Sequence, residues 1–310
     1  MADWSRSNST KGNLDALVAR GLLMPLTAEH EWLVPGEERI PSPPDGYIVS
    51  FRSFHERGFG MPPLPFLRGL LHHYKLELQH LNPNSIQHIS AFVALCEGFL
   101  KIRPHFHLFK YFFTLALQTK KDAEGNPRAV PIGCASFRLR GTRAREYITM
   151  AVTDTNKGWH ERWFYLKNTA LAPLPEFTGR LIEEAPECWG WGPAAPDKKK
   201  LADLLGMIDK LKRGGVAGVG VIGAYHVRRL APLQDRRLPM WEMGHDFAWE
   251  GTCMVDPHAE PRISVRELKA RLSEAMGKTA ADWDSFDYPI PGHPPMLPEQ
   301  GALQFVSFSV

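Results

Sequence analysis

Arginines gather in two short stretches of the sequence that could contact phosphate groups. The first stretch covers residues 138–145 and the second covers residues 226–237. An arginine side chain presents a planar fork of N–H donors that matches phosphate oxygens, and such contacts weaken steeply as the salt concentration rises. The candidate nucleic-acid-binding residues are the arginines of both stretches: Arg138, Arg140, Arg143, Arg145, Arg228, Arg229, Arg236 and Arg237.

The charge distribution supports this hypothesis without deciding it. Residues 101–145 contain ten lysines and arginines against two acids, a net of +8, whereas residues 241–300 contain five against eleven, a net of −6. Such asymmetry favours a face that attracts anions. The alternatives are that the two regions pair with each other, or that the arginines form a solvated edge. The net charge of the whole chain, +3, is too small to indicate a partner.

Sequence-specific reading of DNA bases is not expected. Residues 201–211 and 216–230 have helical patterns in a helix-turn-helix-like arrangement, which places Arg228 and Arg229 late in the second helix. Recognition helices contact bases mainly through their N-terminal residues, and here these are Val, Ala and Gly. The pattern therefore favours nonspecific phosphate binding.

Other motifs for chemistry are incomplete. Gly218, Gly220 and Gly223 form a GxGxxG pattern, but it follows the end of a predicted helix, whereas a dinucleotide site requires a preceding buried strand. We interpret it as a close-packed helix of small residues. The sequence has no HExxH pair, no GxxxxGK[ST] phosphate loop and no GxSxG nucleophile motif.

Histidines, carboxylates and cysteines also lack the spacing of a site. We interpret the clustered histidines as solvated or hydrogen-bonded helix residues; they are His72, His73, His80, His88, His105 and His107. Asp154, Asp235 and Asp246 could form a carboxylate trio, as many other sets could. The scattered cysteines (Cys96, Cys134, Cys188 and Cys253) favour a reducing compartment over a disulfide framework. We therefore predict no catalytic residue, no metal and no cofactor.

The first half of the chain is expected to be helical. Apolar spacing predicts a short helix over residues 14–24 and three more helices between Pro62 and Leu117. These three begin near prolines or capping residues, which suit the first turn of a helix. They predict an N-terminal three-helix unit with an aromatic core. Residues 1–12 are polar and predict a disordered tail.

The pattern becomes extended after a charged turn at residues 120–127. Residues 130–140, 146–152 and 159–166 predict three strands of a small antiparallel sheet. Helical segments at 201–211 and 216–230 then predict a C-terminal helical hairpin. The expected fold class is α+β and mostly helical.

The chain has 310 residues, enough to bury a sizeable core. We predict a tail and short helix over residues 1–30, a core of helices and a small sheet over 31–193, a helical subdomain of the same domain over 194–255, and a C-terminal extension over 256–310. The polar N-terminus does not resemble a signal peptide, and no stretch of 18 uncharged apolar residues occurs. These features predict an intracellular protein, nuclear or cytoplasmic, without a membrane partner.

Seven longer strings carry a more specific signal than any short motif: Pro35–Phe51, Phe54–Gly60, Leu81–Ile86, Phe92–Gly98, Gly158–Leu166, Pro175–Arg180 and Arg237–Met243. These strings resemble the gypsy-type transposon domain that is abundant in grass genomes. The resemblance runs from about residue 30 to residue 255.

This resemblance implies a transposon-derived, non-enzymatic plant protein, similar to the N-terminal part of a retroelement reading frame. The family is sometimes labelled transposase, but it provides no catalytic residues to transfer. The leading hypothesis is a Gag-like structural or interaction module that self-associates or binds nucleic acid. The alternatives are a DNA-binding regulatory protein recruited from a transposon and a transposase-like nuclease.

Overall fold

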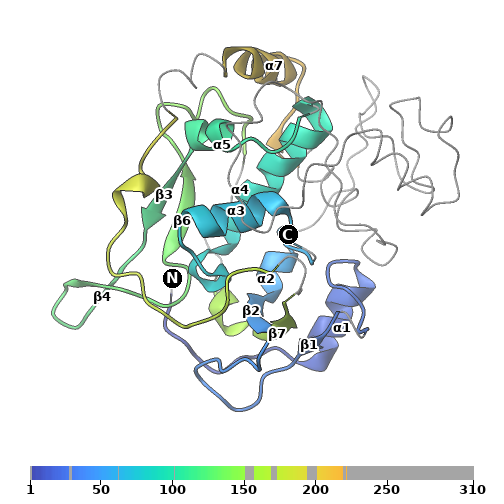
Figure 1. Ribbon diagram of the computed structural model, residues 1–310, viewed down its shortest axis with the longest axis vertical. Coiled ribbons are helices and arrows are strands. Elements are labelled where there is room, and N and C mark those ends of the chain that lie inside the picture. Colours follow the sequence, from blue (N-terminus) through green and yellow to red (C-terminus); the bar gives the residue numbers. More distant parts are fainter. Residues whose placement is uncertain are drawn as a thin grey trace, which may run out of the picture.

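The computed structural model describes residues 2–27, 30–61, 63–100, 102–150, 157–168, 173–193, 201–218 and 221. In this part the chain is α+β, with helices packed against small antiparallel sheets (Figure 1). The α-helices are α1 (Lys11–Ala19), α2 (Arg52–His55), α3 (Pro65–His73), α4 (Pro83–Ala94), α5 (Phe106–Phe112) and α7 (Ala202–Arg213). The strands are β1 (Trp32–Leu33), β2 (Tyr47–Phe51), β3 (Phe113–Leu117), β4 (Lys120–Lys121), β5 (Pro127–Arg128), β6 (Ala135–Leu139) and β7 (Trp163–Lys167). Short helical segments are η1 (Leu78–His80), η2 (Leu95–Leu100), η3 (Trp159–Glu161) and η4 (Glu187–Trp189).

The helices α3 and α4 form where the sequence predicted them. In α3 the apolar face, including Phe66 and Leu70, is buried. The side chain of Asn82 caps α4 by accepting a hydrogen bond from the backbone N–H of Ser85 at 2.8 Å. The π-helix η2 then continues α4, so the buried apolar face extends beyond the regular helix.

The third predicted helix is shorter than expected. The helix α5 ends at Phe112, and β3 begins at the next residue, where the prediction continued the helix to Leu117. Phe113 and Leu115 of β3 are buried while Thr114 is half-buried, which is the two-residue period of a strand. The spacing of the apolar residues in this aromatic run fits both a helix and a strand. The strand forms because it pairs with β6, and this pairing cannot be read from the local sequence.

In both main sheets, strands pair with partners that are not their neighbours in the order of strands along the chain. The first has the order β1–β7–β2, with Ile48 opposite Leu166, and the second pairs β3 with β6. The predicted sheet of residues 130–140, 146–152 and 159–166 therefore has the wrong partners. The described part of 146–152 contains no strand. Alternation indicated that strands exist but could not indicate which segments they pair with.

The charged turn predicted near residue 120 is the β4–β5 hairpin, which projects from the body of the molecule (Figure 1). Gly125 in its turn has a φ of +90°, which favours glycine. Asp3 anchors the hairpin by accepting hydrogen bonds from Arg128 at 2.8 Å and Lys120 at 3.2 Å. The charges of this turn are thus partly paired within the fold.

Residues 2–10 are packed against the core, which corrects the predicted disordered tail. The backbone N–H of Ala2 donates to Ile132 at 3.1 Å. The ring of Trp4 lies 6.3 Å from the ring of Phe51 and 6.0 Å from that of Trp163. The polar composition of residues 2–10 does not indicate this packing. The packing depends on one tryptophan and on several backbone hydrogen bonds. The helix α1 also begins earlier than predicted, at a Thr10 cap.

The helix α7 confirms the helical segment expected around residues 201–211. Its residues Leu204 and Ile208 are buried, and Gly214 follows its last turn. The second helix of the predicted hairpin lies almost entirely outside the described residues, as do residues 222–310. Among the helices that the structure describes, none combines the length and apolar character needed to cross a bilayer.

Candidate functional site

Arg140, directly after β6, binds backbone carbonyls inside the protein. Its Nε donates to the carbonyls of Lys110 at 2.9 Å and Phe113 at 3.1 Å. Its Nη1 and Nη2 donate to Gly190 at 3.0 Å and Trp191 at 3.1 Å. The guanidinium fork thus clamps the α5–β3 corner to the η4 segment, and burial lowers the pKa of Arg140. This structural role competes with the predicted phosphate contact.

Arg143 is neutralised by a neighbouring carboxylate. Its Nη1 donates to Glu146 Oε1 at 2.7 Å, and its guanidinium lies 4.5 Å from the ring centre of Tyr111. The hydroxyl of Tyr111 donates to Glu146 Oε2 at 2.5 Å. Burial alone would raise the pKa of Glu146, but the hydrogen bonds from Tyr111 and Arg143 hold it below its ordinary value. The arrangement leaves little charge for an external phosphate.

Arg138 and Arg145 are the outward-facing members of the first arginine stretch. Both are exposed. Arg138 donates to the amide oxygen of Gln118 at 2.7 Å, and the backbone carbonyl of Arg145 accepts from Lys212. Neither guanidinium has a carboxylate partner within the part of the chain that the structure describes. The second stretch, with Arg228, Arg229, Arg236 and Arg237, lies outside the described residues.

His55, a fully buried histidine of α2, is not among the candidate residues named from the sequence. His55 Nδ1 donates to the carbonyl of Leu22 at 3.1 Å, so His55 Nε2 must accept from the hydroxyl of Ser50 at 3.0 Å. Burial lowers the pKa of His55 to about 4. A serine–histidine pair can form a nucleophile. Both side chains are completely buried, however, so a substrate has no access to the Ser50 hydroxyl.

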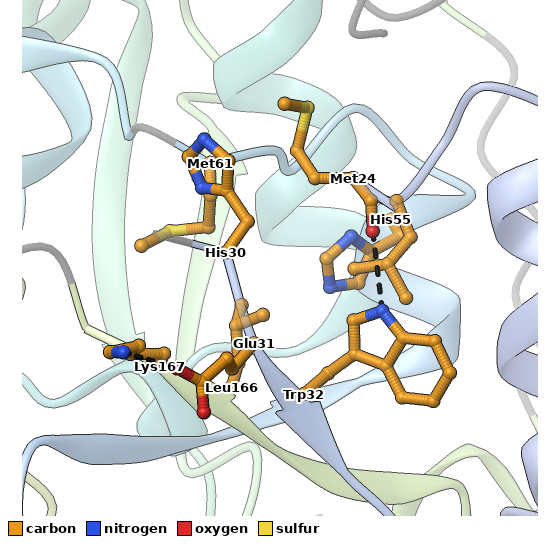
Figure 2. A pocket seen from close by; sticks show the side chains of 9 residues that line it. Met24, His30, Glu31, Trp32, His55, Met61, Leu166 and Lys167 are labelled. Carbon is orange, nitrogen blue, oxygen red and sulfur yellow. Dashed lines mark hydrogen bonds and ion pairs between the residues drawn. The ribbon is translucent and has the colours of Figure 1, made fainter. Parts of the chain in front are cut away.

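A small cavity lies beside His55 (Figure 2). Its volume of about 10 Å³ accommodates at most one water molecule. At its edge Glu31 accepts from Tyr47 at 2.6 Å and pairs with Lys167, while Trp32 Nε1 donates to Met24 at 3.2 Å. The geometry is that of a joint between β1 and the β2–β7 pair. It is too small for a substrate.

A second buried network surrounds Glu77. Its carboxylate accepts from the hydroxyl and backbone N–H of Thr178 at 2.6 and 2.9 Å, from Gln79 at 2.5 Å and from Arg180 at 3.2 Å. Burial alone would raise the pKa of Glu77, but the hydrogen bonds from Thr178 and Gln79 lower it. His80 Nε2 donates to the carbonyl of Arg180 at 3.0 Å. His80 is therefore hydrogen-bonded, as predicted, and the network ties η1 to residues 178–180.

The other clustered histidines differ in their exposure to solvent. His88 and His105 are buried, whereas His72 and His73 are exposed. No group of three or more His, Cys, Asp or Glu residues among the described positions could hold a metal ion. The candidate trio of Asp154, Asp235 and Asp246 lies outside the described residues, as do Gly220 and Gly223.

Gly218, the first glycine of the GxGxxG pattern, is packed closely. Its backbone N–H donates to Thr149 at 2.9 Å, and a Cβ at this position would lie 2.5 Å from Met150 Cγ. The glycine therefore allows close approach to another part of the chain. This is the behaviour expected from our close-packing interpretation, and it occurs where a dinucleotide site would need room for a pyrophosphate.

One continuous stretch of the chain matches a known family. It contains the elements β2, α2, α3, α4, α5 and β3. Residues 48–117 match the family described as "Putative gypsy type transposon". The match confirms the resemblance over these residues, and the name of the family model contains the word transposase. The resemblance predicted beyond residue 117, up to about residue 255, stays a prediction. Comparisons with curated proteins and with solved structures found no match.

Proposed function

We propose that the protein is a transposon-derived, non-enzymatic, Gag-like structural and interaction protein that binds nucleic acid without sequence preference. One contrast supports the proposal. The deeply buried polar groups Ser50, His55 and Glu77 are occupied in joining elements. The exposed cations Arg138 and Arg145, in contrast, face solvent without a carboxylate partner in the described structure. Polar chemistry thus stabilises the interior, and positive charge is left on the surface.

Binding of fluorescently labelled oligonucleotides tests this function. Anisotropy is measured from about 50 to 200 mM salt, a range in which phosphate contacts lose much of their affinity. We expect the logarithm of the affinity to fall linearly with the logarithm of the salt concentration, equally for oligonucleotides of shuffled sequence. Absence of binding at the lowest salt concentration, or binding that ignores salt, would contradict the proposal. A strong preference for one sequence would favour the DNA-binding regulator instead.

A matched pair of variants locates the contact. Arg138→Gln with Arg145→Gln removes two exposed charges, and we expect weaker binding to every oligonucleotide. Arg6→Gln with Lys11→Gln removes the same charge at positions paired with Glu37 and Asp15, and it serves as the control. An equal effect of both double variants would mean that only net charge matters.

Self-association is a second candidate, which one observation favours. The strand β1 pairs only with β7 among the described strands, so no described strand covers its other edge. Leu33 of β1 and the adjacent Val34 are exposed, and so are Leu26 and Ile40, which lie close to β1 in sequence. A second copy of the chain could cover them. Light scattering should show a mass above the monomer that Ile40→Lys lowers, and a monomer at every concentration would exclude this candidate.

A further inference from the structure

Trp191 exposes a large aromatic side chain just after η4. Its exposed fraction is 59%, whereas Trp189, two residues earlier, is 2% exposed and packs in the core. The other tryptophans that the structure describes are buried or half-buried. A single exposed apolar residue is common on a protein surface, so the surroundings of this ring decide what it can bind.

The backbone that carries Trp191 is anchored to the core, while the neighbouring residues leave its ring uncovered. Trp189 is buried, and its Nε1 donates to the carbonyl of Tyr74 at 3.3 Å. The residues that flank Trp191 are Gly190 and Gly192, which have no side chains. A Cβ at Gly192 would meet nothing within 4 Å apart from its chain neighbours. A ring held in this way needs little further ordering when it binds a planar ligand.

Two arginines lie on the same face of the β3–β6 sheet as η4. The backbone N–H of Arg140 donates to the carbonyl of Phe112 at 2.8 Å, so the ladder continues one position beyond β6. Arg138 and Arg140 are therefore two positions apart on one strand, with both side chains on one face and about 7 Å between them along the strand. Arg138 is opposite Thr114, whose hydroxyl donates to the last carbonyl of η4 at 3.4 Å. Arg140 donates to the carbonyl of Trp191 at 3.1 Å, so Trp191 lies at the end of this arginine row.

We propose that Trp191 stacks on a base of single-stranded nucleic acid and that Arg138 contacts a neighbouring phosphate. An indole stacks on the face of any base, and cations beside it bind the backbone, so the combination binds without sequence preference. In a duplex the base faces are already stacked on each other. Arg138 is exposed and gives one donor of its guanidinium fork to Gln118, so other donors remain for a phosphate. The inference rests on the proposed function and specifies its substrate as an unpaired strand.

Oligomers with and without bases separate stacking from charge. Oligothymidylate and an abasic oligomer of equal length carry the same phosphates, and only the first offers bases. We expect the full-length wild type to bind oligothymidylate about tenfold more tightly than the abasic oligomer. Trp191→Leu, which keeps an apolar side chain without a ring, should bind both alike and should bind a duplex as the wild type does. Trp191→Phe should keep most of the difference, whereas Arg138→Gln should weaken binding of both oligomers.

Control variants test exposed apolar area, charge and folding separately. Leu181→Ala removes another exposed apolar side chain and should leave both affinities unchanged. Glu187→Gln removes an exposed negative charge from η4 and should tighten binding of both oligomers. Because the ring of Trp191 is exposed, Trp191→Leu should unfold at the same urea concentration as the wild type. Weaker binding by this variant then reports on the site and not on a loss of structure.

Failure of the stacking site and failure of the proposed function give different results. Equal, salt-dependent binding of both oligomers by the wild type would overturn the stacking site and leave the proposed function standing. An equal loss of affinity in Leu181→Ala and Trp191→Leu would also overturn the site. If the wild type binds no oligomer, both proposals are wrong. If Trp191→Leu lowers the mass measured by light scattering and leaves the affinities unchanged, Trp191 contacts a second copy of the chain and not a base.

Discussion

Replacing Arg140 with lysine keeps the positive charge of the side chain and removes its planar fork of donors. The two possible roles of this residue then give different results. A phosphate contact depends mainly on charge and would survive the change in large part. The clamp on the carbonyls of Lys110, Phe113, Gly190 and Trp191 depends on the fork and would not. We expect Arg140→Lys to lower the free energy of unfolding and to leave nucleic-acid affinity nearly unchanged.

The magnitude follows from the four hydrogen bonds. The two bonds to Gly190 and Trp191 are exposed, so water replaces much of what is lost there. The carbonyls of Lys110 and Phe113 share the single N–H of Arg140 Nε, and this three-centre bond is partly buried. A hydrogen bond to a charged group contributes about 1.5–3 kcal/mol, so we expect a loss of about 2 kcal/mol for Arg140→Gln. An ammonium group that still reaches one carbonyl halves the loss, to about 1 kcal/mol for Arg140→Lys.

Urea titration followed by tryptophan fluorescence measures these losses. Arg138→Lys is the matched control, because Arg138 is an exposed arginine of the same stretch whose contact is one side-chain amide. The control should unfold at the same urea concentration as the wild type. If Arg140→Lys does so too, and Arg140→Gln weakens oligonucleotide binding, then Arg140 is a ligand-binding residue and the clamp is unimportant.

Three further substitutions test the packing and the buried titratable groups. Trp4→Ala removes a ring packed against Phe51, and we expect a loss of about 2 kcal/mol in a urea titration; an unchanged midpoint would mean that residues 2–10 are a loose tail. Glu77→Gln leaves one acceptor oxygen in place of two, so its amide NH2 must face either the donors of Thr178 and Gln79 or the guanidinium of Arg180, and the change should cost about 2 kcal/mol at pH 7. Because the fold lowers the pKa of Glu77 below 4.5, its contribution is present above that pH and is lost as the pH falls through the folded pKa. The stability of Glu77→Gln should therefore vary less with pH in that acidic range, and an identical pH profile would contradict the network. Burial lowers the pKa of His88 from 6.5 to about 4, so the unfolded chain binds its proton first and stability falls between those pH values by up to about 3 kcal/mol. His88→Leu should lose that much less in the same pH series, and an equal loss would show that His88 is not responsible.

Local patterns predicted the elements that depend on local information. The helix α4 follows from Asn82, Pro83 and an apolar face, because capping and spacing lie within a few residues. The strand β3 could not be predicted in the same way. Its aromatic residues fit a helix as well as a strand, and the choice depends on β6, which begins 18 residues after β3 ends. The order β1–β7–β2 could not be predicted from local patterns either, because β7 pairs with strands far from it in the sequence.

For the candidate site, too, the sequence predicted some features and not others. Residue types and clustering predicted a basic surface, and Arg138 and Arg145 are indeed exposed. Partners could not be predicted, because the carbonyls that bind Arg140 come from four residues on both sides of it in sequence. Contacts across long sequence separations determine which charges are free.

The pairing of β2 with β7 also has a consequence during protein synthesis. Lys167 leaves the ribosome about 120 residues after Tyr47, its partner in the ladder. At about 5–20 residues per second, the apolar strand β2 waits about 6–24 s for that partner. During this interval the nascent chain carries an unpaired strand edge that contains Ile48, Val49 and Phe51. A fragment that ends at residue 117 would keep this edge unpaired permanently, so expression of the family-matched segment alone should yield aggregates, whereas fragments that extend beyond β7 should be recovered in the supernatant.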